Sequence, residues 1–397
     1  MIHEKWFKKQ VLALMAVAAF DVVGVSAGQP SADSVDFVSP FLYTGSPGFS
    51  TDFGLQGIKG GDTEGTFIIT GTSTGTSPNV NGVVYKGPVN HGFTADGSGT
   101  GQWFVMNVPP SFNATSTSIY GPDNLGGGTV NLVGSYVSCN LRIGFFYAGP
   151  LTNTPSSGNF LSYRGRNLTT GQLADFTYIH SISRGLAVGN YGFQGEGNPF
   201  GHAFIYNPST PAQPQKDIVF KDSDKTHTAY GIWYNGGSSY TIAGGVGLPS
   251  GLMNYGDPLG LAYLMDYDSS TGRFSNYQTF DYKPEGPDSQ DFKGKTILTH
   301  FEGIWSDSKG LYKLPATVSS TEDGLSKAFV VDVRLQPNGR FSTNATWSPI
   351  NIPGASVSTN DSIFADTSVG LVTYPNIPGQ HEIVTDYAVT PIITERP

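Results

Sequence analysis

Short apolar runs separated by Gly, Asn, Asp and Pro follow one another along most of this chain. Each run spans about four to seven residues, which is the length and spacing typical of β-strands joined by tight turns. Long runs with the 3.6-residue period of an amphipathic helix are absent from the sequence. The pattern therefore predicts an all-β fold with little helix.

The runs recur in a fixed order, with a repeat of roughly 60 residues and about six copies. The first run of each copy contains Gly or Ser next to an Ile or an aromatic residue. Its six examples are Gly57-Ile58, Tyr120-Gly121, Ser181-Ile182, Tyr230-Gly231-Ile232, Gly303-Ile304 and Ser362-Ile363.

The later runs of a copy are also recognisable. A second run ends near Gly and an aromatic residue, and a fourth starts at Trp103 or Trp347 and closes at proline. The third run is the clearest, in Ala203-Phe204-Ile205-Tyr206, Ala262-Tyr263-Leu264-Met265 and Ala328-Phe329-Val330-Val331. Four short strands per copy predict a four-stranded antiparallel sheet.

Six such sheets in series can stack as a solenoid or close as a β-propeller. Closure protects the sheet edges that a solenoid leaves open at its ends, so we expect a propeller with six blades, five or seven being the alternatives. The segment near residues 41–45 resembles a leftover strand, and it would pair with the last blade. The prediction for residues 28–397 is thus one propeller domain.

The first 27 residues differ from the rest. A basic start containing Lys5, Lys8 and Lys9 precedes an apolar stretch and the small-residue pattern Val25-Ser26-Ala27. This is the layout of a secretory signal peptide cleaved after Ala27, a retained amphipathic helix being the alternative. We expect a secreted protein, extracellular or periplasmic. Its single cysteine, Cys139, leaves packing and sheet closure to stabilise the fold.

Charge narrows the class of partner. Charged residues make up 13% of the chain, and the net charge is −9 with no cluster of Lys or Arg. Nucleic acid is therefore not an expected partner. After residue 27 no apolar run approaches the length of a membrane span. We expect a monomer.

The third run, best seen in Gly201-His202-Ala203-Phe204-Ile205-Tyr206, resembles the HAF repeat of extracellular proteins. In that repeat a Gly-Ile strand and a Val-Val-Gly-Tyr strand precede His-Ala-Phe-Leu-Tyr. The resemblance extends over most of residues 54–390. It implies export and a propeller-like β fold, and it implies no reaction.

Candidate catalytic groups lie around the first run of each copy, because the inner strands of a propeller build its channel. Asp123 and Glu302 are acidic candidates, and His300 precedes Glu302. Two carboxyl groups facing each other across a channel are what glycoside hydrolysis requires. Asp62 and Asp366 are further acidic candidates, and for Asp123 and Asp366 the alternative is a turn-forming role.

Candidate ligand-binding groups are the phased pair Trp233 and Trp305 and the histidines His180 and His227. An indole at the channel mouth can stack on a sugar ring, whereas an indole between blades only packs. Three histidines near equivalent strand ends could meet at a metal ion. Their unequal offsets from the strand favour hydrogen-bonding roles instead, and neither a metal nor a cofactor is predicted.

These observations favour a secreted propeller that binds an extracellular glycan or small ligand, with a carbohydrate as the favoured class. The alternatives are a glycoside hydrolase or polysaccharide lyase acting at the channel mouth, and a structural or adhesive surface module. No Walker loop, dinucleotide fingerprint or Gly-x-Ser-x-Gly elbow is present in the sequence.

Overall fold

The computed structural model confirms the all-β prediction. It describes residues 41–42, 53–74, 80–89, 101–196, 201–219, 227–247, 260–283, 291–320, 322–352, 354–374 and 383–389, of which 41–42 and 383–389 are described by backbone only. Within these ranges the named helices are two short 3-10 turns, η1 (Pro110–Phe112) and η2 (Ser157–Asn159), and Asp291 is a single further 3-10 position. The predicted signal peptide lies outside the described residues.

The strands form four hydrogen-bonded sheets, which divide into six antiparallel groups. We call these groups units 1 to 6. Unit 1 consists of β2 (Phe53–Gly60), β3 (Thr66–Thr74), β4 (Val80–Pro88) and β5 (Gln102–Val105). Unit 2 consists of β6 (Ser116–Gly126), β7 (Thr129–Ser138), β8 (Leu141–Pro150) and β9 (Phe160–Tyr163). Unit 3 consists of β10 (Phe176–Ser183), β11 (Leu186–Gly192), β12 (His202–Tyr206) and β13 (Lys216–Asp217).

The second half of the chain repeats this plan. Unit 4 consists of β14 (His227–Gly236), β15 (Ser239–Gly247), β16 (Gly260–Asp268) and β17 (Arg273–Phe280). Unit 5 consists of β18 (Ile297–Phe301), β19 (Trp305–Ser306), β20 (Leu311–Ser320), β21 (Ser326–Arg334) and β22 (Thr346–Pro349). Unit 6 consists of β23 (Val357–Ser358), β24 (Ser362–Phe364), β25 (Thr367–Tyr374), β26 (Ile383–Val389) and the N-terminal β1 (Phe41–Leu42).

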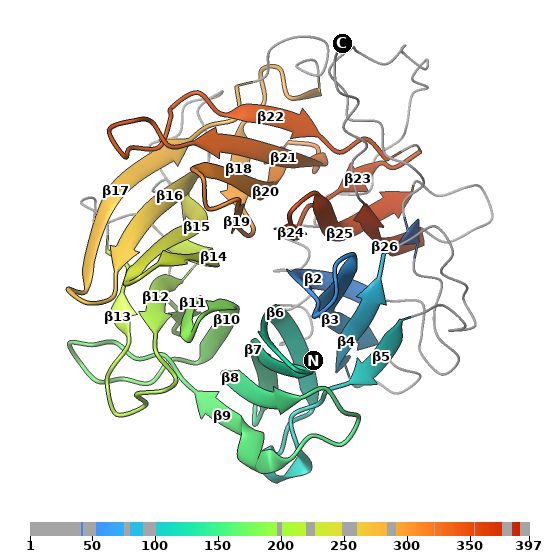
Figure 1. Cartoon of the computed structure of the whole chain (residues 1–397), viewed down its shortest axis with the longest axis vertical. Coiled ribbons are helices and arrows are strands. Elements are labelled where there is room, and N and C mark those ends of the chain that lie inside the picture. Colours follow the sequence, from blue (N-terminus) through green and yellow to red (C-terminus); the bar gives the residue numbers. More distant parts are fainter. Residues whose placement is uncertain are drawn as a thin grey trace.

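Each unit is antiparallel inside, and the links between units are slight. Units 2 and 3 share a sheet through one parallel residue pair, Phe176 with Arg142, and units 4 and 5 through Gly260 with Leu298. The units follow one another around a common centre, with their first strands innermost (Figure 1). Strand β1 pairs antiparallel with β26, so the segment near residue 41 and the last unit form one sheet.

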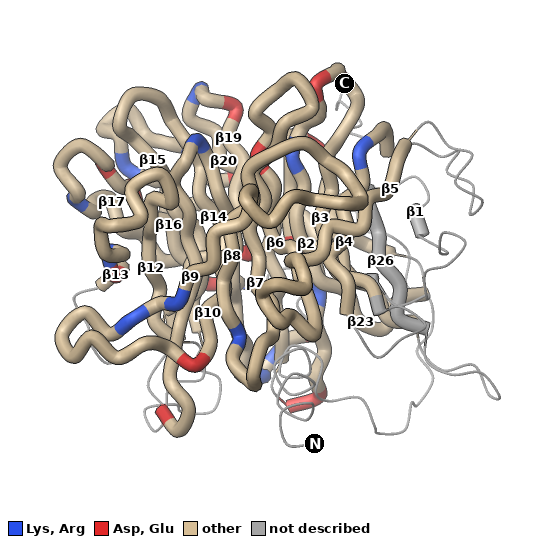
Figure 2. Tube along the Cα trace, turned by 90° about the horizontal axis from the view of Figure 1, so that it is seen from below, with Lys and Arg blue, Asp and Glu red and all other residues tan. Residues whose placement is uncertain are grey.

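Apolar side chains fill the spaces between neighbouring units. One buried cluster joins Ile68 and Val84 of unit 1 to Ile119 and Leu132 of unit 2. Another joins Val188 of unit 3 to residues of unit 4. Charged residues are scattered along the trace (Figure 2). Within the described ranges, neither helix has the length and apolar character needed to cross a bilayer.

The glycines of the predicted first strands stand where neighbouring units touch. A Cβ atom on Gly57 would lie 2.2 Å from the carbonyl oxygen of Tyr120, in the next unit. A Cβ on Gly231 would lie 2.7 Å from the carbonyl carbon of Gly303. No side chain fits at such distances, so the repeated Gly-Ile pattern reflects backbone contact between the first strands of adjacent units.

Replacing Gly57 by alanine tests this contact. We expect Gly57→Ala to lower the free energy of unfolding by about 2–3 kcal/mol, because the new methyl group meets rigid backbone. Urea denaturation followed by tryptophan fluorescence measures the change. Gly158→Ala is the control, since its nearest neighbouring atom lies at 3.8 Å, and it should change stability by no more than about 0.5 kcal/mol. Equal losses in the two variants would contradict the contact.

Candidate functional site

A β-bulge interrupts the first strand of units 1 to 4 at equivalent positions. The register against the second strand shifts between Leu55 and Gly57, and again between Ile119 and Gly121. It also shifts between Ile179 and Ser181 and between Ala229 and Gly231. The extra residues at these four positions are Gln56, Tyr120, His180 and Tyr230. A bulge re-aims the extra side chain, and bulges are often found next to binding sites.

Units 5 and 6 break their first strand at the same place. Glu302 lies between β18 and β19, and its N–H donates to Pro315. Asp361 lies between β23 and β24, and its N–H donates to Val369. Each of the six is followed by Gly or Ser. We call these residues the central ring: Gln56, Tyr120, His180, Tyr230, Glu302 and Asp361.

Five of the six ring residues line one cavity at the centre of the molecule. Its walls come from the first strands of all six units. The residue two positions after each ring residue also lines the cavity. In unit 2 it is Pro122, and in the other five units it is an isoleucine: Ile58, Ile182, Ile232, Ile304 and Ile363. Polar ring residues and these isoleucines together line the cavity.

One side of the ring is aromatic. The Tyr120 and His180 rings lie 5.4 Å apart, and the His180 and Tyr230 rings 4.5 Å apart. The Tyr120 hydroxyl bonds Ser135 at 2.8 Å, and His180 Nε2 bonds the Asn190 amide oxygen at 2.5 Å. These bonds to the second strand fix the two side chains while both continue to line the cavity.

The opposite side is acidic. Burial raises the pKa of Glu302 to about 8, and the neighbouring charge of Asp361 adds to the effect. Burial likewise raises the pKa of Asp361 to about 7. The Glu302 Oε1 atom is buried and has no hydrogen-bond partner among the described residues, and the same holds for Gln56 Oε1. The cavity therefore contains buried acceptor atoms that the described chain leaves unsatisfied.

The nearby histidines do not neutralise these carboxyl groups. His300 Nδ1 lies 4.0 Å from Glu302 Oε1, too far for a hydrogen bond. Burial lowers the pKa of His300 to about 4, and burial lowers that of His180 to about 4 as well. Both imidazoles are therefore neutral at pH 7, and the acidic side lacks a cationic partner from either histidine.

Lys59 lines the cavity beside Trp233, and we call this part of the wall the mouth. Its Nζ lies 4.6 Å from the centre of the Trp233 ring and 3.5 Å from Asp123 Oδ1. Lys59 belongs to unit 1 and Trp233 to unit 4, so the lysine reaches across the cavity. Burial lowers the pKa of Lys59, while the Asp123 charge opposes that shift. The ammonium is held by a cation–π contact and an ion pair.

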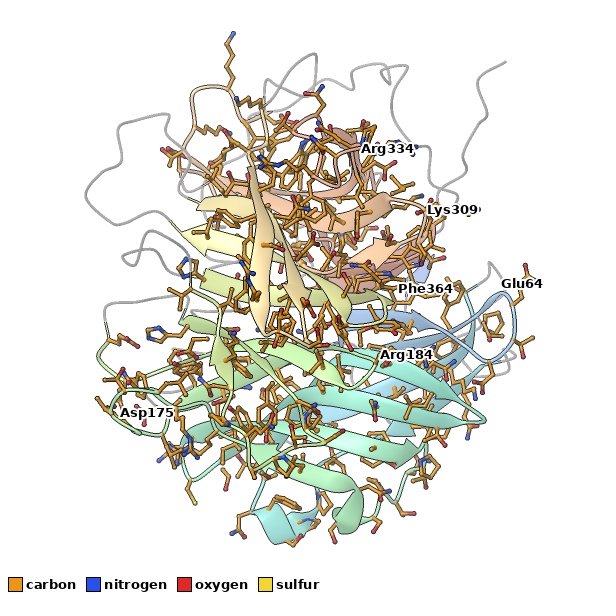
Figure 3. The ribbon with its side chains drawn as sticks, turned by 60° about the vertical axis from the view of Figure 1, so that its left-hand side comes forward. Glu64, Asp175, Arg184, Lys309, Arg334 and Phe364 are labelled. Carbon is orange, nitrogen blue, oxygen red and sulfur yellow. The ribbon has the colours of Figure 1, made fainter. Side chains whose placement is uncertain are left out.

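The predicted tryptophans lie together at this mouth. The Trp233 and Trp305 rings are 6.2 Å apart, and Trp305 packs edge-on against Phe364 at 6.4 Å. Trp233 lines the cavity, but Lys59 covers one of its faces. Glu64 and Lys309 mark turns that follow the first strands of units 1 and 5. Figure 3 shows Phe364 and Arg184 on the same side of the molecule as these two turns.

The other candidates fall in different places. His180 and Glu302 line the cavity, as Trp233 does, and His300 lies beside Glu302. Asp123 is engaged through both oxygens, since Oδ2 accepts from the Arg184 N–H at 2.9 Å and Oδ1 faces Lys59. His227 lies at the start of β14, paired with Val246, and does not line the cavity. The three histidines thus do not converge.

Sequence reasoning missed Gln56, Tyr120, Tyr230, Asp361 and Lys59. A usable signal was present, because each ring residue directly precedes the Gly or Ser of the first-strand pattern. Among the described residues, no group of three or more His, Cys, Asp or Glu side chains is placed to hold a metal ion.

Comparisons with known proteins add little. No protein-family model matches the chain, and no curated protein matches it. The chain is similar to oligopeptidase B from Trypanosoma brucei, solved in a closed form with covalently bound antipain, over 90% of this chain and 49% of that one, with 9% identity and a TM-score of 0.34. It is also similar to the tricorn protease, over 84% of this chain and 36% of that one, with 10% identity and a TM-score of 0.21. The chain thus spans half or less of either structure, and neither likeness bears on its activity.

The raised pKa of Glu302 predicts a pH-dependent stability. Because this pKa exceeds its ordinary value of 4.5, the folded state binds the proton more tightly, and the contribution of Glu302 to stability falls as the pH rises from about 4.5 to about 8. Glu302→Gln removes this cost. The variant should exceed the wild type in free energy of unfolding at pH 8, by about 2–4 kcal/mol, and by little at about pH 5.

Urea denaturation at several pH values measures this difference. The matched control is Glu64→Gln, which makes the same substitution on the exposed β2–β3 turn (Figure 3). The control should track the wild type at every pH. A Glu302→Gln variant that is less stable than the wild type at pH 8 would show that the carboxylate is satisfied in the fold.

Proposed function

We propose that this chain is a secreted, monomeric, six-bladed β-propeller that binds an extracellular carbohydrate in its central cavity. Units 1 to 6 are then the blades, and the pairing of β1 with β26 joins the chain's N-terminal segment to the last of them. The arrangement of the units around one centre supports this interpretation (Figure 1). Export rests on the signal-peptide pattern in residues 1–27.

The observation that carries the proposal is the central ring. It presents one polar side chain from every unit, together with buried oxygen atoms of Gln56 and Glu302 that have no partner among the described residues. A sugar offers many hydroxyl groups around an apolar ring face. Its hydroxyls would satisfy these oxygens, and its ring face would lie against the aromatic side formed by Tyr120, His180 and Tyr230.

In this proposal the tryptophan pair has a different role from the ring. Lys59 already occupies one face of Trp233, and Trp305 packs against Phe364. The two indoles therefore form the wall of the mouth, and a sugar ring that stacks on the covered face of Trp233 would have to displace the Lys59 ammonium.

Binding is tested by titration calorimetry against a panel of monosaccharides and oligosaccharides. At least one sugar should bind, and Gln56→Ala and Tyr230→Ala should each weaken that binding about tenfold, the value of one buried hydrogen bond or ring contact. Gln172→Ala, on an exposed loop between β9 and β10, should leave it unchanged. A panel in which nothing binds would favour a structural or adhesive module instead.

A second candidate function, glycoside hydrolysis or polysaccharide lysis, is favoured by the Glu302–Asp361 pair. A carboxyl with a pKa of about 8 is protonated at pH 7, as a general acid must be. Asp361, with a pKa of about 7, would serve as base or nucleophile. This pair replaces the combination of Glu302 with Asp123, since both Asp123 oxygens are engaged at the mouth.

Activity is tested by release of reducing ends, or of unsaturated products, from a polysaccharide panel. If the chain is a hydrolase, Glu302→Gln should lower kcat at least about a hundredfold, the usual contribution of a general acid. Asp366→Asn, at the exposed β24–β25 turn where Asp366 pairs with Lys313, is the matched control. Turnover that survives in Glu302→Gln would remove Glu302 as the acid.

A further inference from the structure

We propose that the carbohydrate bound in the central cavity carries a positively charged amino group, held by Glu302 and Asp361 against the ring of Tyr230. This inference rests on the proposed function and names the class of sugar. The ligand would be an amino sugar with a free amine, in a monosaccharide or in a polysaccharide.

The balance of charge in the cavity is the first argument. The only Lys or Arg among the lining residues is Lys59, at the mouth. Its ammonium is matched by Asp123 at 3.5 Å. Glu302 also lines the cavity, the charge of Asp361 acts on it, and no second basic side chain belongs to the lining. A cationic ligand group would supply the positive charge that no lining side chain offers to these carboxyl groups.

The kind of unsatisfied atom is the second argument. The buried atoms without a partner in the ring, Glu302 Oε1 and Gln56 Oε1, are both hydrogen-bond acceptors. The Glu302 side chain is only 11% exposed, so water reaches it poorly. The complementary ligand group must donate, and an ammonium group has three donors and no acceptor. A hydroxyl would satisfy one oxygen, whereas an ammonium can satisfy two and neutralise one charge.

The aromatic side of the ring is the third argument. Cations bind over the faces of aromatic rings, and the attraction grows when the site is desolvated. Tyr230 lies next to both halves of the ring: its ring contacts His180 at 4.5 Å, and its phenol interacts electrostatically with Glu302 and Asp361. An ammonium between the two carboxyl groups would therefore also meet the Tyr230 ring.

The same cavity already holds one ammonium in this way. Lys59 Nζ lies over the Trp233 ring and beside the Asp123 carboxylate at the mouth. Tyr230 with Glu302 and Asp361 repeats that combination of aromatic ring and carboxylate, and Lys59 is the only lysine in the described lining.

Binding of a cation beside Glu302 and Asp361 should change the protonation of both carboxyl groups. The titratable groups facing Glu302 are Asp361, Tyr230 and His300, with His180 and Tyr120 across the cavity and Lys59 at its mouth. The histidines stay neutral from pH 6 to pH 9. A bound cation favours ionised carboxyls, so binding at pH 7 should release protons. Affinity for methylammonium, which stays charged over this range as a lysine does, should rise between pH 6 and pH 9.

The experiment is titration calorimetry at pH 7 with glucosamine, glucose and methylammonium, in two buffers of different ionisation enthalpy. We expect glucosamine to bind about tenfold more tightly than glucose, a charge-assisted hydrogen bond accounting for the difference. Its measured heat should depend on the buffer because protons are released. Glu302→Gln and Asp361→Asn should each abolish the preference, and Glu64→Gln should retain it.

The outcomes separate this inference from the function on which it rests. Equal affinity for glucosamine and glucose would overturn the amino-sugar assignment and leave carbohydrate binding intact. Binding of methylammonium alone would support the cation site and overturn the carbohydrate. A preference for glucosamine that persists in both Glu302→Gln and Asp361→Asn would overturn the assignment of the amine to these carboxyls. No binding by any probe would overturn both proposals.

Discussion

The central region depends on close backbone contact between the first strands of neighbouring units. At Gly57 and Gly231 a single added carbon atom would collide with the main chain of the next unit. Strands that approach so closely cannot place side chains between them. In units 1 to 4 the first strand bulges by one residue just before the Gly or Ser, and the extra side chain lines the central cavity. The same close contact between first strands thus determines both how the units pack and which side chains line the cavity.

That constraint has an energetic consequence. It brings a carboxyl pair, two histidines and two tyrosine rings into a space where water is scarce, and the shifted pKa values of Glu302, Asp361 and His180 record the cost. The stabilisation that offsets this cost comes from elsewhere. Apolar clusters such as that of Ile68, Val84 and Ile119 fill the spaces between units. A site that is unfavourable by itself is thus maintained by packing away from it, which is the usual balance between function and stability.

The sequence predicted the strands well because their signal is local. Apolar runs and turn residues recur with one spacing, and the Gly-Ile pattern identified the innermost strand of nearly every unit. The ring escaped prediction for the opposite reason. Its residues are Gln, Tyr, His, Tyr, Glu and Asp, so a search for similar residues at equivalent places passes over them. The Gly or Ser that follows each of them marks the equivalent position in the sequence, and the register of the first strands in units 1 to 4 shows what that position does.

Long-range contacts set a second limit to prediction. Nothing near Lys59 in the sequence indicates that its ammonium reaches Trp233, some 170 residues away and in another unit. Asp123 likewise combines two roles, as a partner of Lys59 and as the acceptor for the Arg184 turn. The turn-forming alternative for Asp123 described part of this arrangement, and the catalytic alternative had no local evidence against it.

Protonation separates the two functions that the Glu302–Asp361 pair can support. A general acid must hold its proton until the leaving oxygen receives it, which requires that the pKa of Glu302 stay near or above neutral when the substrate is bound. A cation binder must instead lose that proton, because an ammonium is stabilised only by the ionised carboxyl. An amine placed between Glu302 and Asp361 would therefore suppress acid catalysis by the same residues. Under the two proposals, the charge of the ligand would thus decide whether this pair binds it or cleaves it.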